Sequence, residues 1–459
     1  MEQGFYTPGM FAGKKITVMG LGLLGRGIGD VKFLAEEGAE LIVTDLKTET
    51  ELAESLQVLS GFSNISYVLG EHRLEDFRNR DFILKAAGVP LDSPYIAEAH
   101  KNGVPVKMST SLFAKHTPAM IVGITGTRGK STVTHMLYEV LKNAIGEESP
   151  WVPALKTTRG RKVFLGGNVR GVSTLPFLRE AKAGDIAVLE LDSWQLQGFG
   201  DERISPHIAI FTTFMVDHLN YYKGDLEAYF EDKAKIFKYQ KKGDCLILGP
   251  QVADQVFARY KLEGGYTIAD PKKIPADWKL PLPGEHNRDN IAITIEAARQ
   301  LGVPAPVLQK SIETFKGVPG RLELLRTWNG VKIYNDTNAT TPDATLAALK
   351  AVAIKKNVLL IMGGADKGID MTNLLEEIPK ACKAVLFLPG TGSTRIEADL
   401  KKVNTDIIPA ASLEQALHEA VARAEKGDVI ILSPAFASFG LFKNEYDRGD
   451  QFNALVARL

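Results

Sequence analysis

The sequence predicts an α/β protein with three domains, and three observations support this prediction. The chain has 459 residues, whereas a single hydrophobic core stops growing at roughly 250 to 300 residues. Short apolar runs alternate with segments whose apolar residues recur at helical spacing, which is typical of sheets covered by helices. Polar or glycine-rich stretches at residues 110–118 and 317–320 interrupt this alternation, and it restarts after each of them.

The first α/β segment begins with a short β-rich run at residues 15–19. A glycine turn, a stretch with helical spacing and a second apolar run at residues 41–43 follow, which together predict a βαβ unit. A further strand is expected at residues 82–84. We therefore predict a first domain over residues 1–115.

The second segment begins with a strand at residues 120–124 and a helix at residues 133–141. Further strands are expected at residues 186–191, 207–211 and 245–248, and a helix at residues 287–301. Strands of the third segment are expected at residues 331–334, 358–362, 384–388 and 429–432. The second and third domains are predicted over residues 116–317 and 318–459.

The composition predicts a globular protein that binds neither nucleic acid nor a membrane. The 55 basic residues balance 55 acidic ones, and no part of the chain forms a charged tail that would attract a polyanion. No apolar run approaches the ~18 residues of a membrane span, and the start lacks the pattern of a signal peptide. Cys245 and Cys382 lie in no metal-binding or redox motif. We expect a cytoplasmic protein.

The strongest functional signal is the loop Gly-Thr-Arg-Gly-Lys-Ser-Thr at residues 126–132, between a predicted strand and a predicted helix. Glycines let backbone N–H groups approach phosphate oxygens, and the helix N-terminus adds positive potential. Lys130 can reach the β and γ phosphates of ATP, and the Ser131 hydroxyl can bind Mg²⁺. Gly123 lies one residue too early for the strict Walker spacing, but the strand, loop and helix context favours ATP binding over a chance surface turn.

A second glycine motif lies at residues 20–25, between the first predicted strand and helix, with Asp45 twenty residues beyond it. This spacing matches a dinucleotide fingerprint, although any doubly wound domain can use such a turn. An oxidoreductase that binds NAD and a protein that binds another nucleotide-bearing ligand both remain open. The phosphate loop in the next domain favours the second.

Three further sites qualify as candidates because of their positions. Glu190 ends an apolar strand where a metal opposite the phosphate loop would need a carboxylate, and we favour it over Asp192. His218 follows another apolar run, where an isolated histidine is more often packed than functional. Lys233 and Lys235, taken alone, indicate the solvated face of a helix.

Taken together, these motifs resemble the Mur ligase family over nearly the whole chain. The resemblance is carried by residues 126–132, Glu190, Asp217, His218, His286, Asn287, Asn290, Arg321, Asn335 and Asp336. Residues 166–168, 189–196, 432–438, 442–444 and 448–449 are similar to those members that add D-glutamate to UDP-N-acetylmuramoyl-L-alanine. The sequence departs from the family pattern at Asn338, Glu445, Leu46 and residues 86–88.

The resemblance implies a Rossmann-like UDP-binding N-terminal domain, a central ATPase domain with a parallel sheet and a Rossmann-like C-terminal domain. It also implies an ADP-forming ligase of peptidoglycan precursor synthesis that joins D-glutamate to UDP-N-acetylmuramoyl-L-alanine through an acyl phosphate. A related ligase with another amino acid or a folate acceptor is the nearest alternative, and a nucleotide sensor without catalysis is a further one. The expected partners are small molecules, and we expect a monomer.

The resemblance also implies roles for individual residues. ATP would contact Gly126, Thr127, Gly129, Lys130, Ser131, Thr132, Asn290, Arg321 and Asp336. Two Mg²⁺ ions would be held by Ser131, Glu190, His218 and a carbamylated Lys233. The UDP substrate would contact Gly22, Leu23, Leu24, Asp45, Asn168, Gln195 and His218, and D-glutamate would contact Thr340, Lys367 and Ser438. The catalytic residues would be Lys130, Glu190, His218 and Lys233.

Overall fold

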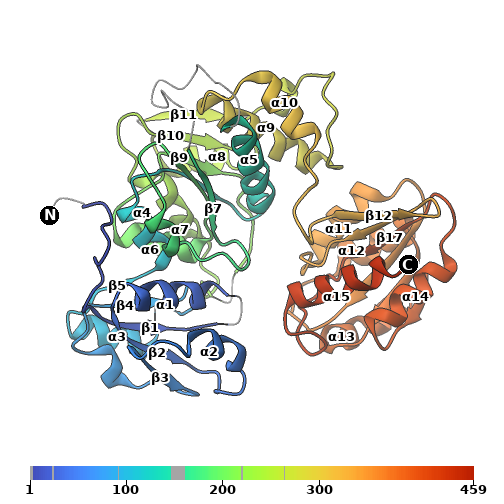
Figure 1. Ribbon diagram of the computed structural model, residues 1–459. Coiled ribbons are helices and arrows are strands. Elements are labelled where there is room, and N and C mark those ends of the chain that lie inside the picture. The colour runs from blue at the N-terminus through green and yellow to red at the C-terminus, as the bar shows by residue number, and fades with distance from the viewer. Residues whose placement is uncertain (1–3, 23–24, 91, 146–160, 219–220, 263) are drawn as a thin grey trace. The chain divides into compact units, whose positions relative to one another are not determined.

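The computed structural model describes residues 4–22, 25–90, 92–145, 161–218, 221–262 and 264–459 (Figure 1). The chain forms two compact units, of which the first runs to Trp278 and also includes Arg288–Glu313, while the second contains Lys279–Asn287 and Thr314–Leu459. Two sheets lie in the first unit and one in the second, which confirms the predicted three-domain α/β fold. Among the described residues, no helix combines the length and the apolar character needed to cross a membrane.

The first sheet is entirely parallel, with the strand order β3-β2-β1-β4-β5. Its strands are β1 (Lys15–Met19), β2 (Glu40–Asp45), β3 (Ile65–Leu69), β4 (Phe82–Lys85) and β5 (Val106–Lys107). The helices around it are α1 (Arg26–Glu36), α2 (Ala53–Leu59) and α3 (Pro94–Lys101), whereas α4 (Ser109–His116) packs against α6 (Ser193–Asp201) of the next domain. Strand order reverses between β1 and β4, and ligands of such sheets bind at the carboxyl ends of the strands beside this point.

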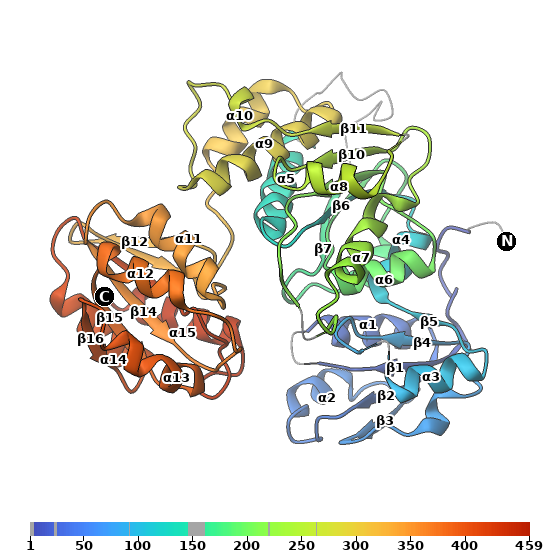
Figure 2. The ribbon, with the colours of Figure 1, turned by 180° about the vertical axis from the view of Figure 1, so that it is seen from behind.

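The second sheet is also parallel, with the order β11-β10-β9-β6-β8-β7. Its strands are β6 (Met120–Thr125), β7 (Val163–Gly167), β8 (Ile186–Glu190), β9 (Ile208–Phe211), β10 (Cys245–Leu248) and β11 (Gly265–Ile268). Its helices are α5 (Lys130–Ile145), α6 (Ser193–Asp201), α7 (Leu226–Lys238), α8 (Ala253–Arg259), α9 (Glu285–Gln300) and α10 (Ala305–Glu313). Figure 2 shows from behind how β10 and β11 form one side of this sheet.

Helices cover this central sheet, so its inner strands are apolar throughout. α5 packs against β7 and β8, and α7 packs against β6 and β9. Strand β8 is buried along its full length, as expected of a parallel strand that is covered on both faces. The apolar runs that predicted these strands are the consequence of this burial.

The third sheet has the order β12-β13-β17-β14-β15-β16 and is mixed, because β12 runs antiparallel to β13. Its strands are β12 (Glu323–Trp328), β13 (Val331–Asn335), β14 (Val358–Gly363), β15 (Cys382–Leu388), β16 (Asp406–Pro409) and β17 (Val429–Leu432). Its helices are α11 (Pro342–Val352), α12 (Thr372–Ala381), α13 (Thr391–Leu400), α14 (Leu413–Arg423) and α15 (Glu445–Ala457). Asn329 and Gly330 join β12 to β13 with positive φ at both positions, as two-residue hairpins prefer.

Candidate active site

The phosphate loop joins β6 to α5, and its two glycines are required by close packing. Gly126 has φ 144° and Gly129 has φ 86°, conformations that side-chain-bearing residues rarely adopt. A Cβ atom on Gly126 would lie 2.0 Å from Thr212 Oγ1, and one on Gly129 would lie 2.3 Å from Asn290 Oδ1. Asn290, on α9, is therefore placed directly against the loop that the sequence predicts to bind ATP.

Gly129→Ala is expected to destabilise the first unit by about 2 kcal/mol, because it adds backbone strain and a clash with Asn290. The same change should prevent saturable ATP binding. Thermal unfolding and nucleotide titration measure the two effects. Gly243→Ala is the matched control, since Gly243 has φ 98° but no heavy atom within 4 Å of the added Cβ position; equal behaviour of the two variants would contradict a special role for the Asn290 contact.

Two lysine side chains share one acceptor in this loop. Lys130 Nζ and Lys233 Nζ each donate to the Gly126 carbonyl oxygen at 2.9 Å. Lys233 is only 1% exposed, and its ammonium lies 4.8 Å from the centre of the Tyr229 ring. Burial and the nearby charge of Lys130 hold the pKa of Lys233 well below its usual value. The interpretation of Lys233 as part of a solvated helix face is therefore wrong.

Glu190 ends β8 beside the phosphate loop, and the residue as a whole is largely buried. It pairs in register with Ile124, the residue before the end of β6, and its side chain is 4% exposed. Within the described part of the chain, no hydrogen bond or ion pair reaches its carboxylate. The carboxylate oxygens are not among the fully buried atoms without a partner, so they keep contact with solvent and can bind a cation.

Asp192, the alternative to Glu190, has a structural role. It is the N-cap residue of α6, and its Oδ1 accepts from Gln195 N at 2.7 Å. The Gln195 side chain completes a capping box by accepting from Asp192 N, and its amide donates to Thr110 Oγ1. The amide group of Gln195, which the resemblance assigned to the UDP substrate, is thus engaged within the protein.

His218 lies in the segment after β9, beside Asp217. Its ring packs against the rings of Trp194 and Tyr229, with centroids 5.0 and 5.8 Å apart. Burial lowers the pKa of His218, although Asp217 opposes this shift. The imidazole is therefore neutral near pH 7 and can offer a ring nitrogen to a metal or a substrate.

An ion pair between the phosphate loop and this segment was not foreseen from the sequence. Arg128 Nη1 lies 2.8 Å from Asp217 Oδ2, and Arg128 N donates to Thr213 Oγ1 at 2.9 Å. Burial alone would raise the pKa of Asp217, but the charges of Arg128 and His218 lower it. Arg128, for which no role was predicted, links the loop to Asp217, the residue that precedes His218.

The described residues hold no cluster of three or more histidine, cysteine, aspartate or glutamate side chains suited to a metal. A Mg²⁺ ion prefers oxygen ligands and usually keeps several waters or phosphate oxygens. The carboxylate of Glu190, which has no protein partner among the described residues, and the Ser131 hydroxyl fit such an ion.

The first glycine motif is tied to Asp45 and to the central sheet. Asp45 Oδ2 accepts from Leu21 N at 2.9 Å and from Gly22 N at 3.1 Å. The carboxylate therefore binds the loop itself, whereas the acidic residue of an NAD site binds the ribose. Arg26, at the start of α1, donates to Asn168 Oδ1 at 2.7 Å, which brings Asn168 next to this motif. Leu23 and Leu24, also predicted here, lie outside the described residues.

Lys85, at the end of β4, is a buried cation that sequence reasoning missed. Its side chain is 3% exposed, and its Nζ donates to the Val89 carbonyl at 2.9 Å and, at longer range, to those of Ala86 and Ala87. Burial lowers the pKa of Lys85 to about 8. Lys85 thus holds the backbone of the loop that departs from the family pattern.

In the second unit, the residues predicted to bind D-glutamate lie on neighbouring segments. Lys367 Nζ donates to Thr340 Oγ1 at 2.9 Å. A bridge between Ala365 and Ala437 brings the segment of Lys367 next to that of Ser438.

Arg448 fixes these segments from inside the second unit. It is fully buried, and its guanidinium donates to Thr337 Oγ1, to the Thr337 carbonyl and to the Phe436 carbonyl. Burial lowers the pKa of Arg448 to about 10. Because Thr337 and Phe436 lie in the segments of Thr340 and Ser438, this buried arginine links them.

Asp336 and Arg321, predicted to bind ATP, are close to each other in the second unit. Asp336 Oδ1 accepts from Leu322 N at 2.9 Å, and Oδ2 accepts from Ser433 Oγ at 2.8 Å. Burial raises the pKa of Asp336 from 3.8 to about 7, although these hydrogen bonds and Arg321 oppose the shift.

The raised pKa predicts a pH-dependent stability of the second unit. Between pH 3.8 and about 7, the folded carboxyl holds a proton that the unfolded chain has released. Stability should therefore fall as the pH rises through this window, by a few kcal/mol at most. Asp336→Asn should remove this loss in urea unfolding at pH 5 and pH 8, whereas Asp343→Asn, at an exposed position of α11, should not. The same loss in all three proteins would contradict the prediction.

Comparisons with known proteins agree with the geometry. The chain matches the Mur ligase MurD-like N-terminal domain over residues 14–108, the Mur ligase middle domain over residues 124–263 and the Mur ligase glutamate ligase domain over residues 320–436. It is 35% identical to the UDP-N-acetylmuramoylalanine--D-glutamate ligase of Roseiflexus sp. (strain RS-1), covering 97% of this chain and 98% of that protein. It is 33% identical to the ligase of the same name from Koribacter versatilis (strain Ellin345), with coverages of 97% and 98%.

Solved structures share the fold at lower identity. UDP-N-acetylmuramate-alanine ligase MurC from Thermotoga maritima has a TM-score of 0.63 and 18% identity, covering 97% of this chain and 99% of that chain. MurF ligase from Thermotoga maritima in complex with ADP has a TM-score of 0.56 and 17% identity, with full coverage of both chains, 100% each. These likenesses show a common three-domain architecture.

Proposed function

The chain belongs to the Mur ligase family, and on this basis we propose that it joins D-glutamate to UDP-N-acetylmuramoyl-L-alanine with ATP, in peptidoglycan precursor synthesis. Relatives that are 33–35% identical over nearly the whole chain are named UDP-N-acetylmuramoylalanine--D-glutamate ligase. The observation that carries the chemistry is the Glu190 carboxylate, which has no protein partner among the described residues and ends β8 beside the phosphate loop. This is where a phosphoryl-transfer enzyme needs a cation.

A carboxylate is a poor electrophile, so the proposed reaction first activates it. An oxygen of the alanyl carboxylate attacks the γ-phosphorus of ATP, the bond to the bridging oxygen breaks, and ADP leaves. The amine of D-glutamate then attacks the acyl carbon, phosphate departs, and the amine loses a proton to give the amide. Mg²⁺, when bound, neutralises charge on the phosphates.

The residues of the first unit would position and stabilise this transfer. Lys130, now bonded to the Gly126 carbonyl, would move its ammonium onto the transferred phosphoryl group. Ser131 and Glu190 would hold one Mg²⁺, and Glu190, His218 and Lys233 would hold a second. Arg128 would keep the loop in register with the segment of His218 through its pair with Asp217.

For Lys233, we propose carbamylation. Burial disfavours the charged form of Lys233 and lowers its pKa, and it is the neutral amine that attacks CO₂. The new N–C bond forms with release of one proton and leaves a carbamate with one negative charge. This would supply the anionic oxygen ligand that the described carboxylates and histidines do not provide as a cluster.

We further propose that residues 1–115 bind the UDP substrate, 116–317 bind ATP and 318–459 bind D-glutamate. Gly22, Asp45, Asn168, Gln195 and His218 would serve the first ligand. Asn290, Arg321 and Asp336 would also contact ATP. Thr340, Lys367 and Ser438 would hold D-glutamate, and the enzyme would act as a cytoplasmic monomer.

Phosphate release with a panel of amino acids tests the proposal. With ATP, Mg²⁺ and UDP-N-acetylmuramoyl-L-alanine, D-glutamate should release phosphate, while L-glutamate, glycine, L-alanine and meso-diaminopimelate should not. Lys367→Met should raise KM for D-glutamate about tenfold or more, through loss of a charge-assisted contact, and leave KM for ATP unchanged. If phosphate were released only with amino acids other than D-glutamate, the protein would be a ligase of this family with a different amino-acid substrate.

A further inference from the structure

A hollow on the central sheet lies away from the proposed active site. Its lining includes Asp244, just before β10, and Gly264 and Gly265, at the start of β11. The phosphate loop follows the carboxyl end of β6, and β6, β9, β10 and β11 are parallel. The hollow therefore lies at the amino ends of these strands, whereas the phosphate loop lies at their carboxyl ends. It contains none of the residues to which the proposed catalysis assigns a role.

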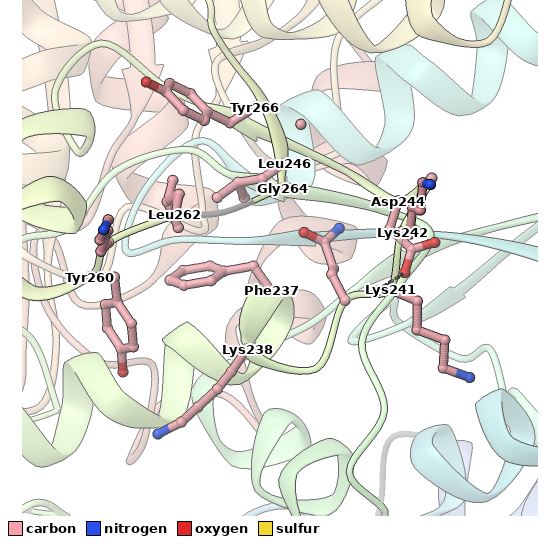
Figure 3. Close-up of a pocket in the computed structure, with 14 residues that line it drawn as sticks. Phe237, Lys238, Lys241, Lys242, Asp244, Leu246, Tyr260, Leu262, Gly264 and Tyr266 are labelled. Atoms are coloured by element: carbon pink, nitrogen blue, oxygen red, sulfur yellow. Dashed lines mark hydrogen bonds between the residues drawn. The ribbon is translucent and has the colours of Figure 1, made fainter.

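The hollow measures about 570 Å³, which lies within the range of ligand sites, and its ends differ in chemistry. Phe237 and Leu246, both buried, lie in the middle (Figure 3). Tyr260 and Tyr266 lie toward one end, and Lys241 and Lys242 lie toward the other. The site thus offers an apolar floor between an end with Lys241 and Lys242 and an aromatic end, where the Lys238 ammonium lies 5.9 Å from the centre of the Tyr260 ring.

Strand β11 borders this hollow and has a free edge. It is the last strand of the sheet and pairs only with β10 among the described strands. Three large apolar side chains around this edge are exposed, namely Phe257 at 38%, Tyr266 at 48% and Ile268 at 42%. The strand carries none of the lysine or proline residues that proteins use to protect an edge. An exposed edge with apolar side chains is a template for an added strand.

The charges around the hollow favour an acidic occupant. Lys241, Lys242 and Lys261 are exposed and make no ion pair with another described residue. The Asp244 carboxylate is engaged, since it accepts from the Lys241 backbone N–H at 2.7 Å. Lys238, in the last turn of α7, forms an ion pair with Glu231. The whole chain is electrically balanced, which favours a short acidic segment over a nucleic acid.

We propose that this hollow and the edge of β11 bind an extended acidic peptide of a partner protein, one that alternates acidic and apolar residues. Main-chain groups of the peptide would pair with β11, its apolar side chains would cover Tyr266 and its neighbours, and its carboxylates would meet Lys241 and Lys242. The function would be docking, separate from ligase turnover.

Fluorescence anisotropy with the full chain tests the proposal, using fluorescein-labelled Glu-Leu-Glu-Phe-Glu-Leu-Glu as the probe. Saturable binding is expected, weakening several-fold between 50 and 300 mM salt. The double variant Lys241→Glu with Lys242→Glu should weaken binding at least tenfold, and Tyr266→Ser should weaken it independently. The matched control, Lys401→Glu with Lys402→Glu, alters an adjacent lysine pair in the second unit and should bind as the unchanged protein does.

Three outcomes would overturn the proposal. The first is absence of saturable binding, and the second is equal binding by the Lys241, Lys242 double variant. The third is equal competition by inorganic pyrophosphate or by a ten-residue thymidine oligonucleotide, which would make the site a general polyanion site. Phosphate release should stay unchanged in the Lys241, Lys242 double variant. Peptide binding therefore tests the docking proposal, and phosphate release tests the proposed ligase activity.

Discussion

Lys130→Met is expected to lower kcat/KM for phosphate release by roughly 10³-fold, the size of effect seen when one charge-stabilising donor of a transition state is removed. The side chain begins α5, and in the free protein its ammonium bonds to the Gly126 and Thr127 carbonyls. When ATP is bound, the Lys130 ammonium can leave these carbonyl oxygens and neutralise charge on the transferring phosphoryl group. Steady-state phosphate release at saturating D-glutamate measures the loss.

The control for this variant is Lys142→Met, in the last turn of the same helix. Lys142 contacts the Tyr138 ring and lies far along the helix from the phosphate loop, so its replacement should leave turnover within about twofold. Thermal unfolding of both variants is measured in parallel, so that a loss of folded protein is told apart from a loss of turnover. If Lys130→Met keeps more than a tenth of the activity, the loop does not act in phosphoryl transfer.

Lys233→Ala is expected to abolish turnover, and a short-chain carboxylic acid should restore part of it. The substitution opens space where a carbamate would stand, and formate or propionate can place an anionic oxygen there. Bicarbonate should not restore activity, because alanine has no amine to modify. Electron density at the Lys233 tip of the unchanged enzyme should show the added carbamate group.

The matched control for Lys233→Ala is Lys235→Ala, on the same helix. Lys235 bonds to Asp232 at 2.7 Å and is partly exposed, so its loss should change stability slightly and rescue should have no effect. Activity in Lys233→Ala that equals that of the unchanged enzyme would refute the carbamate. Loss of activity without rescue by any acid, in a variant with unaltered unfolding, would point to a direct role of the amine.

The fold was predictable from the sequence where a strand is buried on both faces. β6, β8 and β14 are uninterrupted apolar runs because helices cover them, and such runs stand out from their surroundings. β12 was missed because one face of this antiparallel strand is exposed, which breaks up its apolar pattern. The Asn329-Gly330 turn that follows it was the signal that could have revealed the hairpin.

The candidate site was predictable to the extent that its chemistry is local in sequence. The phosphate loop is seven consecutive residues, so its glycines and lysine are visible at once. The pair of Arg128 and Asp217 joins positions 89 residues apart, and no local pattern marks it. Lys85 was missed for another reason, since buried cations are rare and a lone basic residue is ordinarily assigned to the surface. Arg448 lies in one of the stretches that carry the resemblance, but its burial was not predicted.

The position of the site on the central sheet has a consequence for inactivation by heat. Thr125 and Glu190 end β6 and β8, two inner strands of a six-stranded sheet, and the amides of such strands exchange with solvent only when the core opens. A site mounted on loops could melt early and lose turnover while the rest of the protein remains folded. Here the half-life of activity at high temperature should instead equal the half-life of whichever folded unit unfolds first.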